Sequence, residues 1–226
     1  MKILISDYDS TFNPIYAKLS IQRNTKAIEN FRKKGNIFIL SSFLTPSKIQ
    51  RKLEKSKIPF DYLISDNGNL TFDERKNIIQ ANYIDENEIE SLIEFIRDLY
   101  GIKTINYLDP FDNPTLNAPY QIKINTKKLV GHNTLSDLEF DLKIKSFLNQ
   151  IHITHNSNLR NSIVMLLKEL KLNLEKDNIY SLGNSIKDSE MLKSFNGYKI
   201  PLSNPYLILD NEIPLTEGIY TLIKKL

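Results

Sequence analysis

The sequence predicts an α/β fold in which a doubly wound parallel sheet is interrupted by a separate α+β segment. The first observation is a series of short apolar runs, such as Ile37-Phe38-Ile39-Leu40, which are typical of strands buried on both faces. The second is that segments of helical period alternate with these runs, as crossovers between parallel strands require. The third is that this alternation stops near residue 79 and resumes after residue 155.

Five apolar runs are expected to form the parallel sheet. Each is three or four residues long and is followed by turn residues or polar side chains. In chain order the predicted strands are residues 3–5, 37–40, 62–64, 179–182 and 198–200. A hairpin is predicted at residues 70–72 and 78–79, directly after the turn Asp66-Asn67-Gly68.

The helices of this part are predicted from their apolar spacing and their end signals. Asn24 is expected to cap the first helix, and Gly35 to end it. Thr45 and Pro46 open the second helix as N-cap and first-turn proline. Further helices with one apolar face are predicted at residues 159–170, around 191–192 and at 218–226.

The middle third has a different rhythm and is predicted to form a domain of its own. Its expected elements are a helix at 85–100, strands at 104–108 and 120–124, a helix at 136–148 and a strand at 150–154. Half-buried strands combined with amphipathic helices are typical of a small α+β unit. We therefore expect a core domain formed by residues 1–78 and 156–226, with residues 79–155 inserted into it.

The composition is that of an ordinary globular protein and excludes several classes of function. The 226 residues are 41% hydrophobic and 25% charged, with a formal net charge of +3. That charge, without a basic stripe interleaved with aromatic residues, does not indicate nucleic-acid binding. The absence of cysteine excludes disulfides, thiolate metal sites and a cysteine nucleophile. No apolar leader or membrane-length run is present, so we expect a cytoplasmic protein without membrane partners.

The strongest chemical signal is the polar stretch after the first predicted strand. Asp7 and Asp9 follow the run Ile3-Leu4-Ile5, and Thr11 comes two residues later. Open α/β sheets place their chemistry just beyond the carboxyl ends of their strands. Two carboxylates and a hydroxyl at that place suit a hard cation and a phosphate, with a solvated polar turn as the alternative.

Four motifs occur in order along the chain. Asp7-Tyr8-Asp9-Ser10-Thr11 has the form Asp-x-Asp-x-Thr, Ser42 ends the second strand, and Arg160 opens the helix after the middle third. Gly183-Asn184-Ser185-Ile186-Lys187-Asp188 is similar to the loop Gly-Asp-x-x-Asn-Asp. Together they resemble the haloacid dehalogenase superfamily of phosphohydrolases, in its Cof-like class IIB branch. The resemblance implies a Rossmann-like core with an inserted cap of the C2B type, a lid over a small substrate.

The resemblance also implies a role for each of these residues. Asp7 is expected to be the nucleophile that carries an aspartyl-phosphate, and Asp9 the general acid and base. Ser42, or Ser41 one register step earlier, and Arg160 are expected to bind the phosphoryl group. The expected Mg²⁺ ligands are Asp7, Asp9, Asn184 and Asp188. The implied protein is a Mg²⁺-dependent phosphatase of a small phosphorylated metabolite, a sugar or polyol phosphate, acting as a monomer or homodimer.

Departures from the family pattern favour an alternative. Asn184 stands where the family has Asp, and Lys187 where it has Asn, so the metal site loses a carboxylate and gains a nearby cation. Phe43-Leu44 replaces a Gly-Arg pair, and Arg160 replaces a Lys. The alternative is a catalytically weakened relative that binds a phosphorylated ligand or a protein partner. Asp188 also has a purely structural interpretation, as the N-cap of the following helix.

Overall fold

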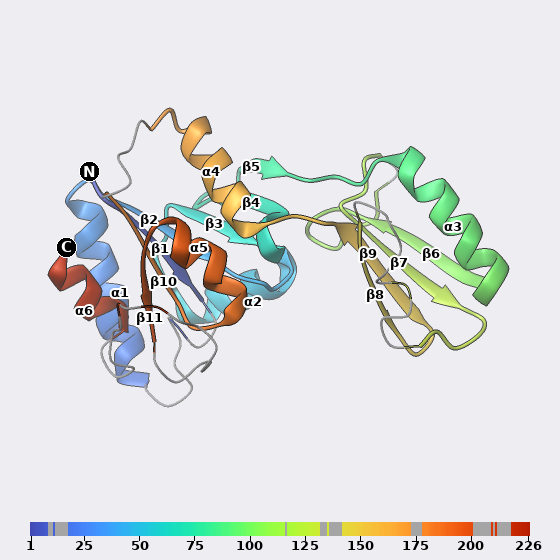
Figure 1. Ribbon diagram of the computed structural model, residues 1–226, viewed down its shortest axis with the longest axis horizontal. Helices are drawn as coiled ribbons and strands as arrows, with labels where there is room; N and C mark the ends of the chain where they lie inside the picture. Colours follow the sequence, from blue (N-terminus) through green and yellow to red (C-terminus); the bar gives the residue numbers. More distant parts are fainter. Residues whose placement is uncertain are drawn as a thin grey trace. The chain divides into compact units, whose positions relative to one another are not determined.

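The chain forms two compact units, which are coloured along the sequence in Figure 1. Unit 1 comprises Met1–Gln80 and Asn158–Leu226, and unit 2 comprises Ala81–Ser157. Unit 2 is therefore an insertion, and the chain passes between the units twice. The computed structural model describes residues 1–8, 11, 18–115, 117–131, 135, 142–172, 178–200, 209, 211 and 218–226.

In its described residues, unit 1 contains a seven-stranded sheet with the order β11-β10-β1-β2-β3-β4-β5. The strands are β1 (Ile3–Asp7), β2 (Ile37–Ser41), β3 (Tyr62–Ser65), β4 (Leu70–Asp73), β5 (Ile78–Ala81), β10 (Ile179–Gly183) and β11 (Asn196–Lys199). The first three strands and the last two run parallel, whereas β4 is antiparallel to β3. The order runs outward from β1 in both directions, which confirms the predicted doubly wound sheet.

Helices lie on both sides of this sheet. They are α1 (Lys18–Lys33), α2 (Pro46–Ser56), α4 (Leu159–Glu169), α5 (Ser189–Ser194) and α6 (Gly218–Lys225), with short 3₁₀ turns η1 (Asp66–Gly68) and η3 (Ile186–Asp188). One apolar cluster joins α4 and α5 to the sheet face that carries Ile3, Ile5 and Ile39. The helices α1 and α6 lie side by side on the other side (Figure 1). Since both faces are covered, β1 is buried throughout.

Two helix starts test the predicted end signals. Thr45 is the N-cap of α2 and Pro46 its first residue, as predicted, and the Thr45 carbonyl accepts from the Ile49 amide at 3.0 Å. The prediction for Asn24 was wrong, because α1 already begins at Lys18. Asn24 is buried inside the helix, where its Oδ1 accepts a hydrogen bond from the Tyr220 amide at 3.1 Å. A polar side chain that joins two helices thus resembled a cap in the sequence.

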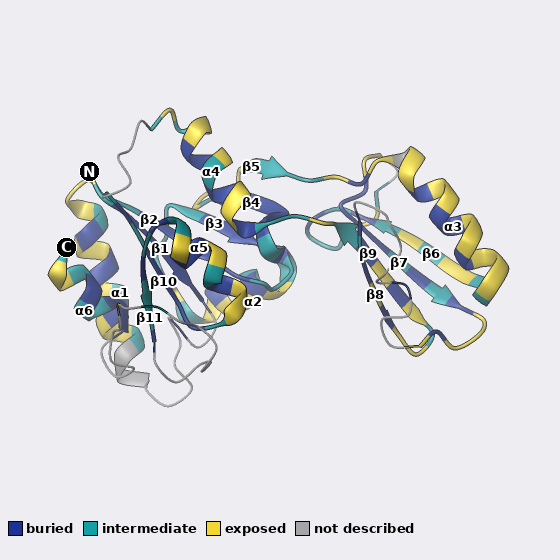
Figure 2. Cartoon of the chain, in the orientation of Figure 1, coloured by how far each residue is buried: buried dark blue, intermediate teal, exposed yellow. Residues whose placement is uncertain are grey.

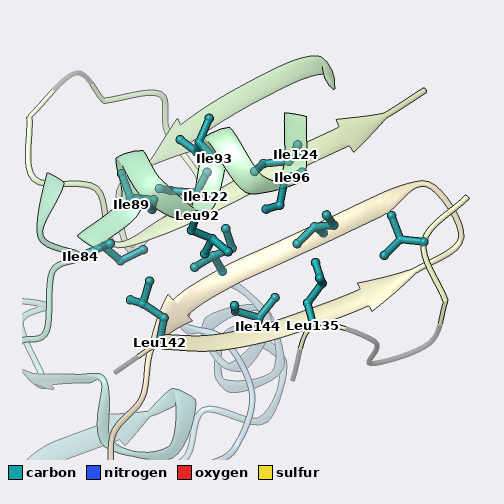
Figure 3. Close-up of a cluster of buried hydrophobic side chains, with 13 residues drawn as sticks. Ile84, Ile89, Leu92, Ile93, Ile96, Ile122, Ile124, Leu135, Leu142 and Ile144 are labelled. Atoms are coloured by element: carbon teal, nitrogen blue, oxygen red, sulfur yellow. The ribbon is translucent and has the colours of Figure 1, made fainter. Parts of the chain in front are cut away.

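Unit 2 is a four-stranded antiparallel sheet with α3 (Glu86–Tyr100) packed on one face. Its strands are β6 (Ile102–Leu108), β7 (Gln121–Thr126), β8 (Leu142–Phe147) and β9 (Gln150–His155), in the order β6-β7-β9-β8. Ile89, Leu92 and Ile96 of α3 pack against Ile122 and Ile124 of β7 (Figure 3). Across the described parts of both units, no helix is long and apolar enough to span a bilayer.

The predicted helix at residues 136–148 is wrong over its second half. Residues 142–147 form β8, which pairs with β9 in antiparallel register, and residues 136–141 lie outside the described part. Leu142, Ile144 and Ser146 are buried while the residues between them are not. That alternation has the period of a half-buried strand, and it outweighs the helical spacing of the preceding leucines.

Candidate active site

Three parallel strands bring the predicted site residues to one edge of the sheet. In the pairing of β1 with β2, Asp7 lies opposite Ser41. The pairing of Ser6 with Leu182 on the other side places Gly183 beside Asp7. Neighbouring strands are about 4.8 Å apart, and paired residues of parallel strands point to the same face. The ends of β10, β1 and β2 therefore form one row, with Asp7 at its centre.

Asp7 is held in a buried position at the end of the central strand. It is 3% exposed and shares a sheet face with Ile3 and Ile5, because side chains alternate along a strand. Strand pairing continues past it, since the Tyr8 amide donates to the Ser41 carbonyl at 2.9 Å. A carboxylate at this place projects into the region where a sheet of this type binds its ligands.

The rest of the first motif is described only at Thr11. Asp9, the predicted acid and base, lies outside the described residues, as does Ser10. The Thr11 side chain is 1% exposed, and its Oγ1 has no hydrogen-bond partner in the described structure. A buried hydroxyl without a partner is costly, and it is expected where a ligand or water completes the hydrogen bonding.

The acidic loop folds the Asp188 carboxylate back onto the end of β10. Its Oδ2 accepts from the Asn184 amide at 3.1 Å, the Ser185 amide at 2.9 Å and the Ser185 Oγ at 2.8 Å. The bonds with Ser185 belong to a capping box at η3, in which Ser185 is the N-cap and Asp188 the third helical residue. Asp188 also occupies the predicted N-cap position of α5, but its side chain makes no capping hydrogen bond there, so its structural role lies in η3. Its Oδ1, however, is buried without a partner among the described residues.

Gly183 permits this arrangement of the loop. A Cβ atom at residue 183 would lie 2.7 Å from the Asp188 Cβ and 3.0 Å from its Oδ2. The carboxylate of Asp188 therefore covers Gly183, the residue beside Asp7 in the neighbouring strand. The Asp188 carboxylate, which belongs to the turn η3, thus lies over the end of β10 on the same sheet face as Asp7. Their closeness depends on the absence of a side chain at residue 183.

Burial gives the Asp188 carboxyl unusual electrostatics. The residue is fully buried, and this desolvation raises the pKa of Asp188 above its ordinary value. Hydrogen bonds from Ser185 and Asn184 and the charge of Lys187 lower the same pKa. A bound cation would favour the charged form as the hydrogen bonds do.

The donor set fits a hard cation. Asp7, Asp188 and Asn184 supply carboxylate and amide oxygens, and each is less than 7% exposed. Hard divalent cations prefer oxygen ligands, and the buried Oδ1 of Asp188 is suited to such a ligand role. Among the described residues no group of three or more His, Cys, Asp or Glu side chains is arranged so that it could hold a metal ion. The donor set thus consists of two carboxylates and the neutral amide of Asn184.

The two serines at the end of β2 differ in their hydrogen bonding: Ser41 is the last residue of the strand and Ser42 follows it. The Ser42 Oγ accepts from the Leu44 amide at 3.1 Å, in a turn that leaves the strand. Ser41 is 1% exposed, shares the face of Asp7 by register, and its Oγ has no partner within the described structure. Ser41, the alternative to Ser42 as a phosphate-binding serine, thus lies beside Asp7 with its hydroxyl available to a ligand.

Arg160 lies in the first turn of α4 and is exposed. Its Nε donates to the Ser194 Oγ at the end of α5 at 2.8 Å, and one terminal nitrogen donates to the Asn161 Oδ1 at 3.4 Å. Asn158 caps this helix by accepting from the Asn161 amide at 3.3 Å. The predicted phosphate-binding guanidinium is therefore engaged with a neighbouring helix.

A strained turn after β3 supports the site from the other side. Asp66, Asn67 and Gly68 all have positive φ angles, of 48°, 58° and 102°. The Asp66 amide donates to the Leu44 carbonyl at 2.9 Å, and the Ser162 Oγ donates to the Gly68 carbonyl at 2.8 Å. Three successive left-handed residues are rare, and strain of this kind collects at functional sites. The Asp-Asn-Gly composition was the sequence signal for this turn.

Comparison with known proteins identifies the family. The profile of the haloacid dehalogenase-like hydrolases matches residues 4–170. The chain belongs to this family. The match of this haloacid dehalogenase-like hydrolase spans most of β1, all of unit 2 and α4. None of the curated proteins matches the chain.

Solved structures have the same fold at low sequence identity. A phosphatase of the haloalkanoate superfamily from Bacteroides thetaiotaomicron is 13% identical with a TM-score of 0.70, and 100% of this chain and 94% of that chain are covered. A haloacid dehalogenase-like hydrolase from the same organism is 15% identical (TM-score 0.70, coverage 99% and 98%). A sugar phosphatase of subclass IIB is 14% identical (TM-score 0.67, coverage 100% and 98%). These likenesses establish the fold of the haloacid dehalogenase-like hydrolase.

Proposed function

We propose that the chain is a Mg²⁺-dependent phosphatase that hydrolyses a small phosphorylated metabolite through an aspartyl-phosphate on Asp7. The observation that carries the proposal is the pair of buried carboxylates at the ends of two adjacent parallel strands: Asp7 ends β1, and Asp188, in the turn η3 after β10, folds back over Gly183 on the same sheet face. Membership of the haloacid dehalogenase-like hydrolases supports a hydrolytic reaction. A buried carboxylate at a strand end has the position that a nucleophile requires.

The reaction has two steps in this proposal. The Asp7 carboxylate oxygen attacks phosphorus, the bond from phosphorus to the ester oxygen breaks, and Asp9 donates its proton to the leaving alkoxide. Asp9 then removes a proton from water, which attacks the phosphorus of the aspartyl-phosphate and releases inorganic phosphate and Asp7. The hydroxyl of Ser42 or Ser41 and the guanidinium of Arg160 bind the phosphoryl oxygens.

Asp7, Asn184 and Asp188 would hold the cation, together with the backbone carbonyl of Asp9. When bound, Mg²⁺ neutralises the charge on the attacking carboxylate and on the phosphoryl oxygens. The buried, unpartnered Oδ1 of Asp188 supports this assignment. Magnesium is preferred within the proposal because all donors are oxygens and the chain contains no cysteine.

A sugar or polyol phosphate is the proposed substrate class. Support comes from the fold shared with a sugar phosphatase of subclass IIB. The test is hydrolysis of an aryl phosphate and a panel of sugar, polyol and nucleoside phosphates, with MgCl₂ or with EDTA. Asp7→Asn should lower kcat by about a thousandfold or more while circular dichroism is unchanged. The control variant is Asp85→Asn, at the exposed N-cap of α3 in unit 2.

Two results would contradict the proposal. One is full activity of the Asp7→Asn variant, and the other is full activity of the wild type in EDTA. Hydrolysis of nucleoside phosphates in strong preference to sugar and polyol phosphates would refute the substrate class and leave the mechanism in place.

Binding without turnover is the second candidate function. It is favoured by Asn184, which supplies no charge to the donor set, and by the cation of Lys187 in the same loop. On this alternative the wild type would bind a sugar phosphate in calorimetry and release no inorganic phosphate from it at any Mg²⁺ concentration. Turnover that depends on Asp7 excludes this alternative.

A further inference from the structure

Two residues that depart from the family pattern are in contact with one another. The Lys187 ammonium lies 5.4 Å from the centre of the Phe43 ring, which is the geometry of a cation–π interaction. Lys187 belongs to the loop after β10, and Phe43 follows β2. The two residues are far apart in the sequence, and nothing in the sequence pattern indicates that they are in contact.

The contact spans the end of β1. In the sheet order β10 and β2 flank β1, so their axes are about 10 Å apart. A contact between the loops that follow them must therefore cross the carboxyl end of β1, where Asp7 is the last residue. Phe43 packs against the cluster that contains Ile3 and Ile5, which is the sheet face of Asp7. Lys187 and Phe43 thus meet on the face that carries the buried carboxylates.

The Lys187 ammonium is available to a ligand. Lys187 is exposed, and within the described structure its ammonium forms no hydrogen bond or ion pair. Its charge acts on Asp188, which places it in the field of the proposed metal ligands. Arg160 differs, because its guanidinium already donates to the Ser194 Oγ. Of these two cations, Lys187 is therefore the one without a protein acceptor.

The charge balance of the site indicates how the Lys187 ammonium would contribute to phosphate binding. A divalent cation neutralises the carboxylates of Asp7 and Asp188 together, and Asn184 adds no further negative charge. A phosphate monoester dianion then requires additional positive charge for tight binding. An ammonium directly beyond the nucleophile supplies it through charge-assisted hydrogen bonds.

We propose that Lys187 is a phosphate-binding residue of this enzyme and that the Phe43 ring is the positioning residue that holds its ammonium over Asp7. The inference rests on the proposed function and names a further group of the same site. Lysine has a long flexible side chain, so the ring restricts the ammonium to the place where the phosphoryl group arrives. The ligand class is the phosphoryl group itself, whichever organic group it is attached to.

The test compares KM and kcat for an aryl phosphate, and the inhibition constant of inorganic phosphate, at saturating MgCl₂. Lys187→Met should raise KM and the inhibition constant together by about tenfold, because one charge-assisted contact is lost. Lys187→Arg should stay within about threefold of wild type, since it keeps the charge. Lys193→Met, an exposed lysine of α5, is the matched control and should behave as wild type.

Variants of Phe43 separate positioning from packing. Phe43→Leu should raise KM by about threefold with kcat little changed, and Phe43→Tyr should restore the wild-type KM, because it keeps a ring. The difference between wild type and Lys187→Met should also shrink as NaCl rises from about 0.05 M to about 0.5 M, since salt screens an exposed charge. A purely structural role for Lys187 would not give this salt dependence.

Failure of this inference is distinguishable from failure of the proposed function. If Asp7→Asn is inactive while Lys187→Met leaves KM and the inhibition constant unchanged, the inference is wrong and the function stands. If the wild type hydrolyses nothing, calorimetry with inorganic phosphate decides: binding that Lys187→Met weakens about tenfold supports the inference. Phosphate binding that is equal in both proteins, or absent from both, overturns it.

Discussion

The two units bury different kinds of side chain. Among the described residues of unit 1 three carboxylates are buried, those of Asp7, Asp66 and Asp188, and each lies at the end of a parallel strand or in the turn that follows it. In the described residues of unit 2 the buried polar side chains are the uncharged Gln121, Thr126 and Ser146. Figure 2 shows buried strands in both units, and the contrast between the units concerns the kind of polar side chain that is buried.

This difference indicates which unit is built for chemistry. Burying a carboxylate is costly unless hydrogen bonds, a counter-charge or a metal compensate it. In unit 1 hydrogen bonds compensate part of this cost, as from Asn69 to Asp66 and from Ser185 to Asp188, whereas the buried Oδ1 of Asp188 has no partner among the described residues and is suited to a ligand. Unit 2 has an almost purely apolar core, with α3 packed on antiparallel strands, as stability alone requires. Substitutions at matched positions in the two units test this contrast. They are made at glycines, at core residues and at aspartates in turns.

Among the variants that compare the two units, the largest expected effect is at Gly183. An alanine there would place its Cβ 2.7 Å from the Asp188 Cβ, so the acidic loop must move away from Asp7. Displacement of a metal ligand by this amount should lower kcat/KM for an aryl phosphate by about a hundredfold. The matched substitution is Gly101→Ala in unit 2, where φ is 62° and the nearest atoms are the Lys127 side chain.

Gly101→Ala should cost about 1–3 kcal/mol of stability, because the backbone at φ 62° and ψ 146° lies in a region that residues other than glycine rarely adopt, and it should leave kcat/KM unchanged. Equal losses of activity in the two glycine variants would show that the strand ends of unit 1 are not the site of catalysis. Thermal unfolding of both variants separates lost activity from lost folding.

Leu92 tests whether the two cores are separate. It is fully buried in the cluster of unit 2, so Leu92→Ala should destabilise that unit by about 3 kcal/mol. Amide hydrogen exchange should accelerate in β7 and β9 and stay unchanged in β1 and β10. Faster exchange in all four strands to the same extent would mean that the chain unfolds as one cooperative unit.

Asn184 tests the donor set at the β10 end. Asn184→Asp adds a carboxylate beside Asp188 and should lower the Mg²⁺ concentration for half-maximal activity by about tenfold. Asn117→Asp adds the same charge in an exposed loop of unit 2 and should leave that concentration unchanged. If the Asn184→Asp variant needs the same or a higher Mg²⁺ concentration for half-maximal activity, residue 184 is not a metal ligand.

The smallest effect concerns a turn that both units share. The Asp73 carboxylate accepts from the Arg75 and Asn77 amides and from the Asn77 Nδ2, each at 2.8 Å. Asp109 of unit 2 accepts in the same way from the Phe111 and Asn113 amides and the Asn113 Nδ2. Asp73→Ala and Asp109→Ala should therefore lower Tm by similar small amounts.

The hydrogen bonds from Asn77 lower the pKa of Asp73 below its ordinary value. The stability that this carboxylate contributes is therefore present above its unfolded pKa of about 4 and is lost as pH falls through the lower folded pKa. The Tm difference between wild type and Asp73→Ala should shrink over that range. A difference that is constant down to pH of about 2 would show that the ionised carboxylate makes no net contribution.

Much of the fold could be predicted because parallel strands leave a strong pattern. The run Ile37-Phe38-Ile39-Leu40 became β2, and the polar residues after Ile3-Leu4-Ile5 lie at the sheet edge where parallel strands place their chemistry. These predictions depend on local sequence and on one general rule of α/β sheets. Placement of Asp7 between Ser41 and Gly183 also required the register of three strands, which local sequence does not contain.

Other features depend on contacts between distant residues. Asparagine is a common N-cap, so the sequence predicts a cap at Asn24. Its actual partner is the Tyr220 amide near the other end of the chain, and no local pattern indicates that contact. The strand β8 was assigned to a helix because six residues of alternation compete with a longer apolar spacing. The contact of Lys187 with Phe43 joins two loops that are adjacent only after the sheet has formed.

The most direct test of the account is to trap the aspartyl-phosphate. Asp9→Asn should accumulate it with an aryl phosphate, because a good leaving group needs no acid whereas release of phosphate needs the base. After an acid quench, intact-protein mass spectrometry should show one added phosphoryl group, mapped to the peptide that contains Asp7. The same group should be absent from the variant that also carries Asp7→Asn. A wild type that hydrolyses the substrate while the phosphoryl group is never found, or is found on another residue, would contradict the account.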